Sequence, residues 1–178
     1  VSMDDHTFTP KLIKKRKQDI FHEVDHNGNY FYIRTNEGAK NYKISKVPTQ
    51  DLHAAWQDYI PEQQDLYLVD FDFTENYLIL NYRQLGLPII KIEKLSTREL
   101  KQIQFLDAAY LATGSSTNFI EDDVRISYSS LNRPKITYNY DFATNQLNVL
   151  KTQEIPSGFN PEEYKVERVF VNSENVRV

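Results

Sequence analysis

The feature that most constrains the fold of this chain is a repeat of about 47 residues. The segment NYFYI at residues 29–33 has counterparts NYLIL at 76–80 and DVRIS at 123–127, each 47 residues further along the chain. Three further positions match at steps of 48 residues, namely Tyr42, Ile90 and Tyr138. A pattern that keeps its phase over about 150 residues at low residue identity indicates one supersecondary unit that is copied along the chain.

Each repeat predicts four antiparallel strands. An alternating strand leads in, a turn follows, and a polar connection (NEGAKN, RQLGLP or SLNRPK) joins the second strand to the third. The expected ranges are 20–26, 66–73 and 109–113 for the lead-in strand, 30–35, 77–82 and 124–129 for the second, 42–47, 89–94 and 136–142 for the third, and 100–105 and 147–153 for the last. Four such strands in about 40–50 residues is the period of a β-propeller blade.

We therefore predict an all-β fold with about three four-stranded antiparallel blades of an incomplete β-propeller. The expected organisation is a lead-in at residues 1–17, blades at about 18–62, 63–108 and 109–163, and a final segment at 164–178. Two alternatives stay open. A single antiparallel sandwich could show the same strand pattern by accident. The stretch STRELKQIQFLDAAYLA could be a helix with Ser96 as its cap and Glu99 three positions on, although its phase match with NQLNVL favours a strand.

The stretch HEVDH, from His22 to His26, matches the zinc-peptidase pattern H-E-x-x-H letter for letter. That pattern needs a helix, because residues i and i+4 are then neighbours on one face. Here Asn27-Gly28 follows at once, and this pair strongly favours a hairpin. On a strand the two histidines would lie about 13 Å apart, at about 3.3 Å per residue. This separation is too large for one zinc ion, whose ligand nitrogens lie at about 2 Å. We predict two histidines on a hairpin strand, and a zinc enzyme that uses His22, Glu23 and His26 stays as an alternative.

The composition argues against several classes of function. The chain has no cysteine, so it has no disulfide framework and no thiolate metal site, and we expect a cytoplasmic protein. The formal net charge is −4 and no apolar run approaches the length of a membrane span, so neither nucleic acid nor a membrane is expected as a partner. One basic run, KLIKKRK at residues 11–17, could be a targeting or nucleic-acid segment. Because no other feature accompanies it, we interpret it as a solvated edge or linker.

Three further groups of residues could carry function. Glu121-Asp122-Asp123 could bind a cation, but no EF-hand spacing follows, so a solvated loop is predicted. Asp70 and Asp72 alternate with apolar residues in LVDFDF and could either line a propeller channel or face solvent. The tyrosine-rich segments ISYSS and ITYNYDF are predicted to pack between neighbouring blades rather than to bind a ligand.

Two long stretches resemble a known family. The end of the chain is similar to the last propeller blade of the prolyl oligopeptidase family, and the residues that carry the similarity are Tyr128-Ser129-Ser130, Pro134, Tyr138, Asp141 and Tyr164-Lys165-Val166-Glu167. Upstream, FHEVDHNGNYFYIRTNEGAKNYKI resembles the stretch H-x-x-x-x-F-Y-x-R-[ST]-N-x-x-G-x-N of the oligopeptidase B (protease II) branch. The matching residues are His26, Phe31, Tyr32, Arg34, Thr35, Asn36, Gly38 and Asn41.

The resemblance implies that the parent protein is a serine-type oligopeptidase, a hydrolase that cleaves short peptides after Lys or Arg. It implies that the propeller is a lid that filters substrates, and that its partners are its own α/β-hydrolase domain and short basic peptides. The family's nucleophile lies on a G-x-S-x-G elbow, which this chain lacks, since Gly114-Ser115-Ser116 has no second glycine. We therefore assign no catalytic, cofactor-binding or metal-binding residue and expect the chain to be inactive alone. A non-catalytic β-propeller-like binding module is the alternative, and exposed sheet edges predict association between copies.

Overall fold

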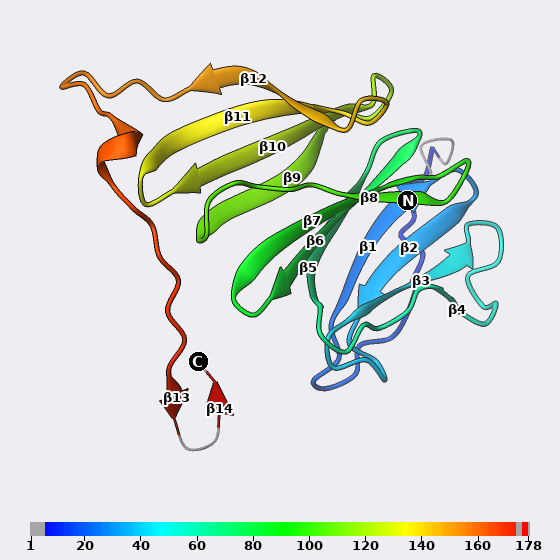
Figure 1. Ribbon diagram of the computed structural model, residues 1–178. Helices are drawn as coiled ribbons and strands as arrows, with labels where there is room; N and C mark the ends of the chain where they lie inside the picture. Colours follow the sequence, from blue (N-terminus) through cyan, green and yellow to red (C-terminus); the bar gives the residue numbers. More distant parts are fainter. Residues whose placement is uncertain (1–5, 174–175, 178) are drawn as a thin grey trace. The chain divides into compact units, whose positions relative to one another are not determined.

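Three four-stranded antiparallel sheets follow one another along the chain in the computed structural model (Figure 1). The structure describes residues 6–173, 176 and 177, so residues 1–5 of the expected lead-in and 174, 175 and 178 of the expected final segment lie outside the described residues. The strands of the three sheets are β1 (His22–Asn27), β2 (Tyr30–Thr35), β3 (Lys43–Pro48) and β4 (Gln57–Ile60); β5 (Tyr67–Phe73), β6 (Tyr77–Gln84), β7 (Leu87–Lys94) and β8 (Glu99–Gln102); and β9 (Tyr110–Asn118), β10 (Asp123–Ser130), β11 (Arg133–Asp141) and β12 (Gln146–Thr152). A short 3-10 helix, η1 (Pro161–Glu163), and a two-stranded hairpin, β13 (Asn172–Ser173) and β14 (Val176–Arg177), complete the described elements.

The predicted fold class is confirmed. In each sheet the spatial order of the strands equals their order in the chain, which is the meander of a propeller blade, and a single sandwich is excluded. The helix alternative for the stretch after Ser96 is wrong. Residues 99–102 form strand β8, which pairs with β7, because Arg98 adopts a positive φ of 60° and turns the chain back on itself.

Some strands differ in extent from the prediction. The connections RQLGLP and SLNRPK are two-residue turns rather than loops, because Gln84 pairs with Leu87 and Ser130 pairs with Arg133. The first of these turns has positive φ at Leu85 and Gly86, as a type I′ hairpin requires. Strand β9 runs on to Asn118, and β4 supplies the fourth strand of the first sheet, for which the sequence indicates no range.

The chain divides into two compact units, residues 1–64 and 65–178. In the first unit the middle strands β2 and β3 contribute the fully buried side chains of Ile33, Ile44 and Val47. The predicted hairpin β1–β2 is present, but its two turn residues are Gly28 and Asn29 rather than Asn27 and Gly28, because Asn27 pairs with Tyr30; Gly28, the first turn residue, has a positive φ of 56°.

The core of the second unit lies between its two four-stranded sheets. Sheet β5–β8 and sheet β9–β12 each contribute apolar side chains from one face to a single cluster: Ile79, Ile90, Ile92, Ile103, Val124, Ile126, Tyr140 and Phe142. Burying an isoleucine of this kind contributes about 1.5–3 kcal/mol relative to leaving it in water. The tyrosine-rich segments therefore pack between neighbouring sheets, as predicted.

Polar side chains of sheet β5–β8 also bind the main chain of sheet β9–β12. The Asn81 amide donates to the Gly114 carbonyl and accepts from the Gly114 N–H, both at 2.8 Å. The Asp72 carboxylate accepts from the Ser116 N–H at 2.7 Å. These bonds align the first strand of one sheet on the sheet before it. Over the described part of the chain, no helix is long and apolar enough to cross a membrane.

Candidate functional site at the end where the chain leaves the third sheet

After β12 the chain runs away from the third sheet as an irregular segment (Figure 1). We call residues 153–171 the exit segment. The Asn132 side chain, in the β10–β11 turn, donates to the carbonyls of Pro161 at 3.4 Å and Tyr164 at 3.2 Å. Asn160 begins η1 and its side chain accepts from the Glu162 N–H. The turn between two central strands thus holds the chain as it leaves the sheet.

The largely buried carboxylate of Asp107 holds the β10–β11 turn in place. Asp107, in the β8–β9 connection, accepts hydrogen bonds from the Tyr128 hydroxyl and from Arg133 Nε, the latter at 3.1 Å. Burial alone would raise the pKa of Asp107, but hydrogen bonds from Tyr128, Ser130 and Arg133 outweigh it and hold the pKa below its ordinary value. Asp107 is therefore ionised near neutral pH, and its charge holds Arg133 beside the turn. We call Asp107, Tyr128, Asn132 and Arg133 the exit clamp.

Aromatic rings support the exit clamp from the sheet side. The Tyr128 ring stacks on Phe105 with a centroid distance of 4.9 Å, and Phe105 also contacts Tyr110 at 4.8 Å. The Tyr110 hydroxyl donates to the Pro88 carbonyl at 3.0 Å. Burial, followed by the bond to Asp107, raises the pKa of Tyr128, so this hydroxyl stays protonated and keeps donating.

The same end of the second unit exposes large apolar side chains. Leu131, next to the clamp, is 88% exposed, and Leu85, in the β6–β7 turn, is 73% exposed. The exit segment passes both turns, because Arg168 Nη2 would lie 3.9 Å from a Cβ placed on Gly86. The segment itself exposes Tyr164, Val169 and Val171. The exposed leucines of the two hairpin turns thus lie at the same end of the second unit as the exit clamp.

The structure places the HEVDH residues on strand β1, as predicted, and does not bring them together as metal ligands. The Glu23 carboxylate pairs with Arg34 Nη1 at 3.0 Å, and the His26 ring contacts Phe31 at a centroid distance of 5.5 Å. His22 contacts Trp56 instead. Among residues 6–173, 176 and 177, no group of three or more acidic or histidine side chains could hold a metal ion.

The other predicted residues also have structural partners. Asp122 accepts from the Asn76 N–H and from Asn76 Nδ2, and Asp123 pairs with Arg125 at 2.6 Å, so the acidic run is not free to gather around a cation. Asp72 binds the next sheet, as described above. Residues 114–116 lie within strand β9 rather than on a strand-to-helix elbow.

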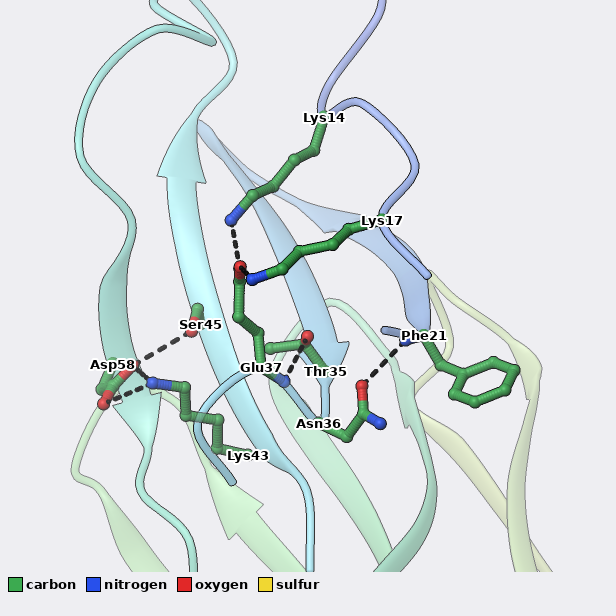
Figure 2. Close-up of polar contacts among 9 residues, drawn as sticks. All are labelled: Lys14, Lys17, Phe21, Thr35, Asn36, Glu37, Lys43, Ser45 and Asp58. Atoms are coloured by element: carbon green, nitrogen blue, oxygen red, sulfur yellow. Dashed lines mark hydrogen bonds and ion pairs between the residues drawn. The ribbon is translucent and has the colours of Figure 1, made fainter. Parts of the chain in front are cut away.

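The basic run is partly engaged in the first unit, as Figure 2 shows. Lys14 and Lys17 both reach the Glu37 carboxylate, and Lys17 Nζ lies 3.5 Å from Glu37 Oε1. Nearby, Lys43 pairs with Asp58 at 2.9 Å, and the Ser45 hydroxyl donates to the same carboxylate. The run is thus partly tied to the sheet rather than fully solvated.

Residues 1–153 match the family model described as the N-terminal β-propeller domain of prolyl oligopeptidase. The chain therefore belongs to this family of peptidase propeller domains. It is 28% identical over 163 residues to dipeptidyl aminopeptidase BI of Pseudoxanthomonas mexicana, across 89% of this chain and 22% of that protein. It is 25% identical over 161 residues to Protease 2 of Moraxella lacunata, across 90% of this chain and 23% of that protein.

Among solved structures, the fold is similar to that of oligopeptidase B from Leishmania major, with a TM-score of 0.87 and 20% identity over 98% of this chain and 26% of that one. The chain spans about a quarter of the length of these relatives, between 22% and 26%.

Proposed function

We propose that this chain is part of the propeller, acting as lid and substrate filter, of a serine oligopeptidase that cleaves short peptides after Lys or Arg. The membership of the family supports a peptidase. The similarity of residues 21–44 to the oligopeptidase B branch supports the preference for basic residues. The relatives carry different names, among them a dipeptidyl aminopeptidase and a prolyl endopeptidase, so the preference is the finer part of the proposal.

The observation that carries the proposal is that the exit clamp lies at the same end of the second unit as two exposed leucines, Leu85 and Leu131. In this proposal the exit segment continues into the α/β-hydrolase domain, and Leu85 and Leu131 contact that domain. The propeller then excludes folded proteins by its size and contributes little binding energy of its own. The serine, aspartate and histidine of the reaction belong to the hydrolase domain, since this chain has no G-x-S-x-G elbow.

The substrate preference is tested on the parent polypeptide with matched short peptides that differ only at the residue before the cleaved bond. We expect turnover after Lys and Arg, and much less after Pro. Turnover mainly after Pro would overturn the preference but leave the family intact. The 178-residue chain alone should hydrolyse none of these peptides, and robust turnover by it would refute the assignment.

The proposed contact surface is tested with two variants, each of which places one aspartate at one end of the third sheet. Leu131→Asp places a carboxylate at the proposed contact, and we expect a drop in kcat/KM of about tenfold, because burying an unpaired charge at an interface costs more than about 1.4 kcal/mol. Ile120→Asp is the matched control. Ile120 is 76% exposed in the β9–β10 turn, at the opposite end of the same sheet. Equal effects of the two substitutions would contradict the proposed surface.

A further inference from the structure

An irregular segment before β1 lies on the first sheet and is held by few contacts. We call residues 10–20 the strap. Its side chains are exposed except for those of Ile13 and Ile20, which are half-buried. The Lys14 ammonium binds the Glu37 carboxylate and lies 4.0 Å from the centre of the Trp56 ring. Lys17 binds the same carboxylate, so Glu37 holds two of the four lysines of the strap (Figure 2).

The strap is also tied through its main chain at its end. Asn36, next to Glu37 in the β2–β3 connection, donates from Nδ2 to the Asp19 carbonyl at 2.9 Å. Its Oδ1 accepts from the Phe21 N–H at 2.8 Å. This pair of bonds fixes the junction between strap and β1, so the part ahead of the junction depends on Lys14 and Lys17. Exposed ion pairs and cation–π contacts are individually weak.

The His22 ring contacts Trp56, the ring on which Lys14 lies, and has no hydrogen-bond partner among the described residues. Its ring meets Trp56 edge-on, with a centroid distance of 5.3 Å and an interplanar angle of 75°. Both ring nitrogens are buried, and neither has a hydrogen-bond partner in the described part of the chain. The charged groups that face the ring are Lys14 from the strap and Glu37 from the β2–β3 connection; Trp56, from the β3–β4 connection, adds no charge. A proton on His22 would therefore be buried, unpaired and close to an ammonium group.

We propose that the strap is released from the first sheet at acid pH, with His22 and Glu37 as the sensing groups. A charged imidazole repels Lys14 from its place on Trp56. A neutral Glu37 loses both of its lysines. The two events act in the same direction, and they go beyond the peptidase function proposed above because they concern the first unit alone.

The direction of the pH effect follows from linkage. Burial and then Lys14 lower the pKa of His22 from 6.5, against an opposing effect of Glu37, and the hydrogen bond from Lys14 lowers the pKa of Glu37 from 4.5. Both groups bind protons less well with the strap attached, so protons favour the released state. The strap stays attached above pH 6.5, and release develops as the pH falls below the ordinary pKa values of His22 and then Glu37.

The test uses the single tryptophan of the chain as a reporter. Trp56 emission and its quenching by acrylamide are followed from about pH 8 to 4, across the ordinary titration ranges of His and Glu. Far-UV circular dichroism of the same samples reports whether the sheets persist. We expect a red shift of the emission and stronger quenching below pH 6.5, while the circular dichroism stays constant.

Three variants separate the sensing groups. His22→Phe keeps a ring against Trp56 but cannot take a proton, so the transition should move to lower pH, where only Glu37 titrates. Glu37→Gln should give stronger quenching already at neutral pH. His26→Phe is the matched control, because His26 is exposed on the same strand, and it should behave as wild type.

Two results would overturn the proposal. One is a Trp56 signal that stays constant until the circular dichroism is lost, and the other is an unchanged transition in His22→Phe. Should that variant fail to fold, the NMR titration of His22 in the wild-type chain replaces it. An imidazole that titrates at or above its ordinary pKa of 6.5 would then refute the proposal, and titration below that value together with the Trp56 transition would support it.

Discussion

Replacing Gly114 by alanine is expected to destabilise the second unit, because no side chain fits at this position of β9. A Cβ would lie 3.0 Å from Ile79 Cγ2 and 3.2 Å from both Ile126 Cδ1 and Ile90 Cγ2. Carbon atoms prefer a separation of about 3.5–4.0 Å. All three isoleucines are fully buried in the cluster between the sheets, so none of them can move into solvent.

The size of the effect follows from two opposing contributions. The Asn81 side chain holds the main chain of Gly114 by two hydrogen bonds, which oppose a shift of the strand away from the isoleucines. Adding a methyl group to a packed core costs about 1–3 kcal/mol. Gly114 is not at a positive φ, so alanine also restricts the unfolded chain, and this contributes about 0.4–1 kcal/mol in the other direction. The expected net loss in free energy of unfolding is about 1–2 kcal/mol.

Urea unfolding measures this loss as a lower midpoint at an unchanged slope. Ser115→Ala is the matched control, because Ser115 is the next residue of the same strand and is exposed, and its effect should stay within about 0.5 kcal/mol. Should Gly114→Ala prove as stable as wild type with the same slope, the described packing of the two sheets would be wrong.

Three further predictions concern single contacts. Asn81→Ala leaves the N–H and the carbonyl of Gly114 unpaired in the core and should cost about 2–4 kcal/mol in urea unfolding; a loss below about 0.5 kcal/mol, typical of a surface site, would contradict it. The hydrogen bond from Lys43 lowers the pKa of Asp58 from 3.8. The ionised Asp58 therefore stabilises the folded state above pH 3.8, and this contribution is lost as the pH falls through the lower pKa of the folded state. In Asp58→Asn the free energy of unfolding should therefore fall less steeply as the pH is lowered into the acid range. An acid dependence identical to that of the wild type would contradict this prediction. Edge strand β12 exposes 60% of Val149, so we expect concentration-dependent association by light scattering that Val149→Lys suppresses; a wild-type monomer at high concentration would disprove it.

The sequence predicted most reliably those strands whose own side chains define them. The segment YFYIRT is rich in aromatic and β-branched residues, and β2 has the predicted bounds of Tyr30–Thr35. Strand β4 carries only QDYI, which is short and polar, and its place depends on contacts of Asp58 with Lys43 and Ser45. The end of β9 reads GSSTN, a run of small residues with little strand preference of its own. It is held as a strand by pairing with β10 and by Asp72 of the neighbouring sheet.

The exit clamp could not be predicted, because its contacts join residues far apart in the sequence. Asn132 binds carbonyls 29 and 32 residues further along the chain, and Asp107 meets Arg133 across 26 residues. No periodic pattern records such pairs, and the residue types of SLNRPK predict only a polar loop. The resemblance to a family does not say which side chains hold the exit segment.

The bonding of Asn81 to the peptide group at Gly114 has a consequence for how such a chain can change over time. A side-chain amide that binds the main chain of the next sheet does not restrict the residue types of that sheet. The exception is the one position, Gly114, that must stay without a Cβ. Successive modules can then exchange most of their amino acids and still dock in the same register. The second and third repeats, whose sheets this bonding joins, agree poorly in residue identity and keep a constant spacing, which is the pattern that such a joint permits.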